Sequence, residues 1–145
     1  MVSVALIDDH AGLLRELKAI ISEQEGYRVV DTGAAASAIP RIAKEWSPDL
    51  MIIDLSMPGD VFAAIAEARV LSPRTRLMVF TAYAEIELAR RALTAGADAF
   101  VKKGLFGQDF FEAIAACLAG RRFVSQPLRA RLEAGDANQK PPSPE

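Results

Sequence analysis

The sequence predicts an α/β fold in which helices cover both faces of a parallel sheet of five strands. Short apolar runs alternate with helical patterns along about the first 120 residues. The runs are continuously apolar instead of alternating in polarity, which is typical of strands buried on both faces. Strict alternation of strands and helices favours parallel pairing of the strands. Such a chain makes a doubly wound fold.

The first half of the chain supplies two strands and two helices. The run Val2 to Ile7 is the first predicted strand, and Tyr27 to Val30 is the second. Between them, apolar residues recur at helical spacing with charged residues on the opposite side: Leu13, Leu14, Leu17, Ile20 and Ile21. A second helix should begin near Ser37, a natural N-cap, because Pro40 is tolerated in a first turn but breaks a helix interior.

The second half continues the alternation with three strands and three helices. The predicted strands are Leu50 to Ile53, Leu77 to Phe80 and Ala99 to Val101. The predicted helices run from about Val61 to Leu71, from Glu85 to Ala95 and from about Gln108 to Leu118. Gly96 and Gly120 follow the last two helices, where glycine commonly ends a helix.

Composition and charge exclude several classes of protein. The chain has 145 residues, of which 51% are hydrophobic, and this suits one well-packed domain. The formal net charge of -2 gives no global attraction to nucleic acid or anionic lipid. No apolar run approaches the roughly 20 residues of a membrane span, so we expect a cytoplasmic protein with no membrane partner. The single cysteine, Cys117, lies on the apolar face of the last helix and should be buried.

The sequence changes character after Gly120. We predict a domain over residues 1–120 and a linker or tail, partly disordered, over residues 121–145. Four arginines lie between Arg121 and Arg131 with no acid among them. They could contact nucleic acid, but we favour a solvated cluster beside a helix carboxyl terminus, where positive charge is stabilising.

Residues suited to chemistry follow the predicted strands. In a doubly wound sheet the functional crevice lies beyond the carboxyl ends of the strands. These ends carry Asp8, Asp9, Asp54, Thr81 and the pair Lys102-Lys103. Three crowded carboxylates repel one another unless a cation lies among them, and a set of oxygen ligands suits Mg²⁺. A carboxylate beside such a metal can attack phosphorus, while a hydroxyl and an amine bind the other phosphoryl oxygens.

Four segments carry a resemblance to a known family: Val4 to His10, Asp49 to Gly59, Val79 to Ala82 and Ala95 to Gly104. They are similar, in the same order, to the motifs of response-regulator receiver domains in two-component signalling. The Asp-Asp-His start and the exit Gly120 to Ser125 most resemble the branch that precedes a LuxR-type helix-turn-helix. The resemblance implies the flavodoxin-like strand order 2-1-3-4-5 with five helices.

The resemblance also implies a role for each candidate residue. The phosphoacceptor would be Asp54. The Mg²⁺ ligands would be Asp8, Asp9, Asp54 and the backbone carbonyl of Ser56, and the switch residues would be Thr81, Phe100 and Tyr83. Lys103 fits the family's lysine better than Lys102, because the family has an aromatic switch residue three positions earlier, where Phe100 stands. On phosphorylation, Phe100 would turn inward.

Some positions depart from the family pattern or vary within it. His10 matches a variable position at a helix start, so we favour a structural role over a catalytic one. The segment Met57 to Phe62 is about one residue shorter than usual, and Gly104 stands where many receivers have proline.

The implied function is a phosphoaccepting switch and not a turnover enzyme. Its partners would be a sensor histidine kinase and a second copy of the chain. That copy would bind through the surface of helix 85–95, strand 99–101 and helix 108–118, or through the first and fifth helices. DNA would be contacted only through an output domain absent from this chain, since too few residues follow Gly120.

Two alternatives stay open. One is a stand-alone receiver that acts by protein contact. The other is a Mg²⁺-dependent phosphatase that passes through an aspartyl phosphate. The phosphatase interpretation needs an acid two positions after the nucleophile, where this chain has Ser56.

Overall fold

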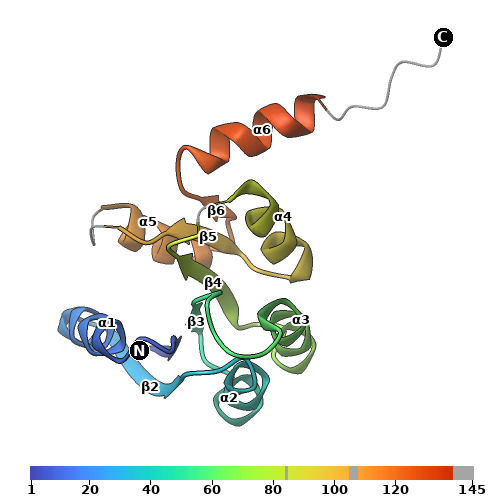
Figure 1. Cartoon of the computed structure of the whole chain (residues 1–145). Coiled ribbons are helices and arrows are strands. Elements are labelled where there is room, and N and C mark those ends of the chain that lie inside the picture. The colour runs from blue at the N-terminus through green and yellow to red at the C-terminus, as the bar shows by residue number, and fades with distance from the viewer. Residues whose placement is uncertain (84, 105–107, 139–145) are drawn as a thin grey trace.

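The computed structural model of the chain describes residues 1–83, 85–104 and 108–138. Its centre is a 6-stranded parallel sheet of order β2-β1-β3-β4-β5-β6 (Figure 1). The strands are β1 (Val2–Ile7), β2 (Tyr27–Gly33), β3 (Leu50–Ile53), β4 (Arg76–Thr81), β5 (Ala99–Lys102) and β6 (Phe123–Val124). The helices are α1 (Ala11–Glu23), α2 (Ala38–Trp46), α3 (Val61–Leu71), α4 (Ile86–Ala95), α5 (Gln108–Leu118) and α6 (Leu128–Asn138).

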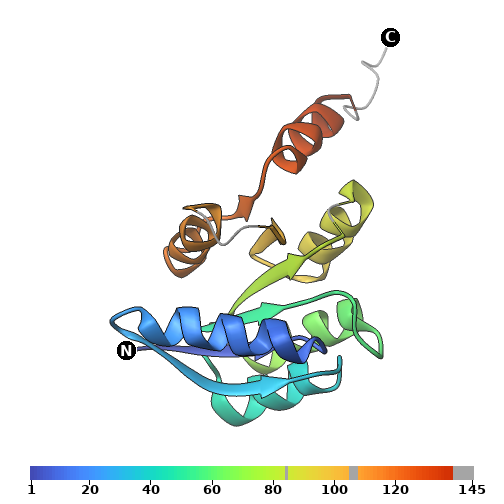
Figure 2. The same ribbon diagram turned by 60° about the vertical axis from the view of Figure 1, so that its left-hand side comes forward.

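Side chains of successive strand residues alternate between two separate hydrophobic cores, one on each face of the sheet. Ala5 and Ile7 of β1 pack with α2, α3 and α4 on one face. Val4 and Leu6 pack with α1 and α5 on the other. The two views show this division, with α1 running alongside β1 and β2 in Figure 2. Burial on both faces explains why the central strands read as continuous apolar runs.

The predicted order 2-1-3-4-5 is confirmed, and most of the predicted bounds match. The strand at Val2–Ile7 and the helices at Val61–Leu71 and Gln108–Leu118 have the expected ends. β2 continues three residues beyond Val30 to Gly33. Its added residues include polar ones, which an edge strand tolerates because one side of it is open to solvent.

Helix starts follow the sequence signals, with one correction. The Asp60 carboxylate accepts a hydrogen bond from the Ala63 N–H at 3.1 Å and caps α3. α2 does begin after Ser37 and holds Pro40 in its first turn. Ser37, however, makes no side-chain capping bond, because its φ of -61° and ψ of -21° are helical instead of extended.

Two elements were not predicted from the sequence, β6 and α6. β6 extends the sheet beyond β5: the Phe123 N–H donates to the Asp98 carbonyl at 3.2 Å, and the Ser125 N–H donates to the Phe100 carbonyl at 3.0 Å. The Lys102 N–H donates to the Ser125 hydroxyl at 3.0 Å. The part of the predicted tail over residues 139–145 lies outside the described residues.

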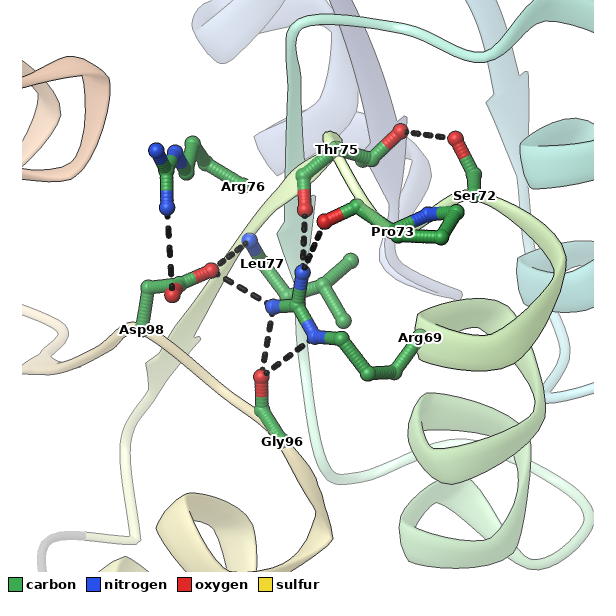
Figure 3. A network of polar contacts seen from close by, with 8 residues as sticks. All are labelled: Arg69, Ser72, Pro73, Thr75, Arg76, Leu77, Gly96 and Asp98. Atoms are coloured by element: carbon green, nitrogen blue, oxygen red, sulfur yellow. Dashed lines mark hydrogen bonds and ion pairs between the residues drawn. The ribbon is translucent and has the colours of Figure 1, made fainter. Parts of the chain in front are cut away.

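A network around Arg69 ties α3, β4, α4 and β5 together at the amino ends of the strands (Figure 3). The Arg69 guanidinium donates to the Gly96 carbonyl at 2.6 Å, to the Thr75 carbonyl at 2.8 Å and to the Asp98 carboxylate at 2.6 Å. Asp98 also accepts from the Leu77 N–H at 2.8 Å. The carboxyl end of α4 is therefore anchored at Gly96 (φ +123°), a backbone conformation that favours glycine.

Candidate functional site

The carboxyl ends of four strands bring the chemically active residues together. Asp8 directly follows β1, Asp54 follows β3, Thr81 ends β4, and Lys103 follows β5. Backbone bonds fix these positions: the Asp54 N–H donates to the Ile7 carbonyl at 2.9 Å, and the Lys103 N–H donates to the Thr81 carbonyl at 2.7 Å. The side chains are thus held by rigid elements at one edge of the sheet.

Lys103 is the lysine that enters this crevice. Its ammonium lies 2.8 Å from an oxygen of Asp8 and 3.4 Å from an oxygen of Asp54. Its side chain is 19% exposed, against 3% for Asp8 and 5% for Asp54. Lys102 is exposed to solvent. Adjacent residues at a strand end point to different sides, so the backbone aims one lysine of the pair inward.

Asp8, Asp9 and Asp54 form a cluster able to hold a metal. Each offers one carboxylate oxygen, and these oxygens lie within 4.8 Å of one another. One Asp54 oxygen faces Lys103, while its other oxygen, Oδ1, is buried and has no hydrogen-bond partner among the described residues. A buried acceptor without a partner is costly, and three carboxylates outnumber the single ammonium. The residues therefore fit a divalent cation with oxygen ligands.

The cluster opens into a cleft of about 820 Å³. Its wall includes Asp9, Ser56, Tyr83 and Lys103, together with residues of α1. Ser56 is exposed, and Tyr83 is 52% exposed at the rim. A phosphoryl donor can therefore reach Asp54 from solvent.

Thr81 and Phe100 are buried and do not line this cleft. Thr81 is fully buried, and its hydroxyl oxygen accepts from the Tyr83 N–H at 3.1 Å, which leaves the hydroxyl proton free to be donated elsewhere. Phe100 is 0% exposed and belongs to the same core as Val124 and Leu128. The ring that was expected to turn inward already lies inside in this structure.

His10 has the structural position expected from the sequence. Its imidazole Nδ1 accepts from the Leu13 N–H at 3.0 Å and caps α1. The His10 N–H in turn donates to the Asp8 carboxylate at 2.8 Å, so it helps to orient that acid. Sequence reasoning missed this bond, although an Asp that accepts from the N–H two residues later is a recurrent turn signal.

Comparisons with known proteins agree with this geometry. A family model described as "Response regulator receiver domain" matches residues 4–115. The chain is 30% identical over 131 residues to the transcriptional activator protein ExaE of Pseudomonas putida, covering 89% of this chain and 61% of that protein.

Two solved structures are similar. A LuxR-family two-component response regulator from Aurantimonas sp. SI85-9A1 superposes with a TM-score of 0.86 at 29% identity, covering 93% of this chain and 97% of that chain. The signal receiver domain of the putative response regulator NarL from Mycobacterium tuberculosis superposes with a TM-score of 0.74 at 30% identity, covering 83% of this chain and 98% of that chain.

The chain spans 61% to 64% of the length of the first curated relatives. Within the described ranges, no helix is long and apolar enough to cross a membrane. The family match, the fold and the acid cluster agree with one another. The chain belongs to the response regulator receiver domain family of two-component signalling, among relatives that include LuxR-type regulators.

Proposed function

We propose that this receiver acts in the cytoplasm and takes a phosphoryl group onto Asp54 from the phosphohistidine of a sensor histidine kinase, in a reaction that needs Mg²⁺. One observation carries the proposal. Asp54 is buried at the base of an open cleft, with one oxygen beside Lys103 and the other without a partner among the described residues. A nucleophile and its electrostatic partners thus meet in one place.

The chain's own residues position and stabilise the transfer. Asp8, Asp9, Asp54 and the Ser56 carbonyl would hold the metal, which when bound offsets negative charge on both nucleophile and phosphoryl group. An oxygen of Asp54 bonds to phosphorus as the nitrogen–phosphorus bond of the phosphohistidine breaks. The imidazole leaves with the bonding electron pair. Lys103 remains within reach to bind a phosphoryl oxygen.

The negative charge of the phosphoryl group on Asp54 would act on Thr81 and Tyr83, which precede α4. The Thr81 hydroxyl now accepts from the Tyr83 N–H, and a phosphoryl oxygen offers it an acceptor for its own proton. Arg69 fixes the carboxyl end of α4 at Gly96. A displacement of Thr81 would therefore move mainly the amino end of that helix. Phosphorylation would thereby change the α4 surface in a two-state manner.

The output of this switch would be control of transcription through an output domain. The relatives are longer than the chain and include a transcriptional activator. A second copy would bind through α1 and α5, because β6 pairs with the outer edge of β5 and α6 contacts α4. β6 and α6 thus cover part of the surface formed by α4, β5 and α5, which is the other candidate dimer surface.

Intact-mass spectrometry with an acyl-phosphate donor tests the proposal. The parent chain with Mg²⁺ should gain one phosphoryl group, and Asp54→Asn should gain none. Asp60→Asn is the matched control, because Asp60 is an exposed N-cap that asparagine can replace. A phosphorylated Asp54→Asn protein would refute the assignment. Continuous turnover of the donor far beyond one equivalent would instead support a phosphatase.

A further inference from the structure

A second cleft lies beside β6, the strand at one edge of the sheet. It measures about 880 Å³ and is bounded by α4, α5, the turn into β6, and α6, which leaves β6 and lies beside α4 (Figure 1). Among the described residues, none lines both this cleft and the one at Asp54. Its volume is in the range of small-molecule sites, roughly 300–1,000 Å³.

Arginines dominate the polar lining of this cleft. Three come from the segment after α5 and one from α4: Arg121, Arg122, Arg129 and Arg90. In the part of the chain that the structure describes, none of the four forms an ion pair, although Glu112 and Glu133 line the same cleft. The four arginines and two glutamates leave a net charge of +2 on the lining.

Two of the guanidinium groups are held in place by their surroundings. The Arg129 Nε–H donates to the Val124 carbonyl at 2.9 Å, and its guanidinium lies 5.0 Å from the centroid of the Phe123 ring. The Arg90 Nε is buried and has no hydrogen-bond partner among the described residues. Its guanidinium is so close to Gly135 that a Cβ there would clash with it. A buried donor without an acceptor is costly, and an anionic oxygen would satisfy it.

Apolar side chains line part of the wall between the arginines. Leu93 of α4, Ala115 and Ala116 of α5, and Leu132 of α6 contribute to them. Convergent charged groups on apolar walls are typical of a site for an organic anion. Guanidinium groups bind phosphate oxygens in pairs, and a phosphate monoester carries about -1.5 to -2 at neutral pH, which matches the lining.

We propose that this cleft binds a small phosphorylated metabolite, with its phosphate on Arg90 and Arg129 and its organic part against the apolar wall. The ligand would bridge α4 and α6. It would thus give the receiver a second input that does not use Asp54.

A titration of the whole chain without divalent metal tests this proposal. The probes are inorganic phosphate, ribose 5-phosphate and AMP, and the readout is the NMR shift of the arginine Nε–H signals. Without metal, the acids at Asp54 repel phosphate, so the second cleft responds alone. Both organic phosphates should saturate, shift Arg90 and Arg129, and bind more tightly than inorganic phosphate. The tighter of the two identifies a nucleoside or a sugar as the organic part.

Matched variants locate the binding. Arg90→Gln and Arg129→Gln should each weaken it about tenfold or more, the usual cost of a lost hydrogen bond to a charged group. Arg131→Gln is the control, because Arg131 is exposed on α6 and does not line the cleft. It should change affinity by less than about twofold, as an isolated surface charge does. Thermal unfolding of each variant checks that it is folded.

Several results would overturn the proposal. Equal weakening by Arg131→Gln would mean diffuse attraction to a basic surface. Absence of saturation by any probe at about 10 mM would mean no useful affinity. Inorganic phosphate that binds as tightly as the organic phosphates would exclude a role for the apolar wall. An acidic peptide that binds where all three fail would assign the cleft to a protein partner. Each readout is independent of phosphorylation at Asp54.

Discussion

The three acids at the ends of β1 and β3 differ in exposure. Asp8 and Asp54 are buried, whereas Asp9 is exposed and lines the cleft. Lys103 contacts the two buried acids, so a metal that enters from solvent meets Asp9 without a competing ammonium. Of the three acids, Asp9 would therefore contribute its charge to a bound metal with the least competition from Lys103.

Removal of that charge should weaken metal binding. We expect Asp9→Asn to raise the Kd for Mg²⁺ about tenfold or more, since one of few carboxylate ligands loses its charge. Glu16→Gln is the control, because Glu16 is an exposed acid of α1 on the same cleft. Saturable NMR shifts during a Mg²⁺ titration measure both values. Equal affinity in the Asp9→Asn protein and the parent would contradict the metal site.

The two adjacent lysines should differ in the switch. Lys103→Ala should accept the phosphoryl group more slowly, and its phosphorylation should not shift α4. The reason is that no ammonium is then present to bind the charged phosphoryl oxygens. Lys102→Ala should behave as the parent does, since its exposed side chain is outside the cleft. The phosphorylation-dependent NMR shifts of α4 decide between them. A loss of these shifts in Lys102→Ala alone would reverse the assignment.

Cys117 gives a prediction about pH. Burial raises the pKa of its thiol from 9.0 to about 12, and the charge of Asp98 adds to the rise. The native state keeps the proton that the unfolded state loses above pH 9.0, so the free energy of unfolding should fall between pH 9.0 and about 12. Below pH 9.0 this contribution is constant. Urea unfolding should show a steeper alkaline loss in the parent than in Cys117→Ala; equal slopes would contradict it.

At the scale of elements, the Arg69 network joins four segments by hydrogen bonds. Its acceptors are the carbonyls of Gly96, Pro73 and Thr75 and the carboxylate of Asp98. The Asp98 side chain is 24% exposed, and Arg76 lies 3.9 Å from it as a second, weaker partner. Loss of Arg69 would leave several partly buried acceptors without donors.

Arg69→Ala should therefore lower the free energy of unfolding by about 2 kcal/mol or more. Arg74→Ala, an exposed change five residues along the chain, should stay within about 0.5 kcal/mol of the parent. Urea unfolding at neutral pH measures both. A loss no larger in Arg69→Ala than in Arg74→Ala would mean that the network is not stabilising.

The sequence predicts some elements better than others, for physical reasons. α1, α3 and α5 have strong apolar patterns or matching end signals, and they were found where expected. β6 has only two residues, too short for a periodicity, and it forms because β5 offers an unpaired edge. α6 contains Gly135 and few apolar residues, so its helix depends on contacts with α4 that the sequence does not reveal.

For the whole molecule, the alternation of strands and helices and the family motifs predicted the strand order. They also predicted which strand ends carry Asp8, Asp54, Thr81 and Lys103. The contact of Lys103 with Asp8, more than ninety residues away, could not be predicted because it depends on the register of separate strands. Phe100 is likewise buried in a core that includes Val124, its sheet partner in β6, and Leu128 of α6, and the sequence does not reveal this arrangement.

The central claim is that Asp54 receives the phosphoryl group, and direct location of that group tests it. Phosphorylated parent chain is reduced with borohydride, which converts an aspartyl phosphate to homoserine, and the peptides are sequenced by mass spectrometry. Homoserine should stand at position 54 alone, and only when Mg²⁺ was present during phosphorylation. Homoserine at position 8 or 9 instead, or an unchanged peptide around Asp54 from protein that carries the phosphoryl group, would contradict the account.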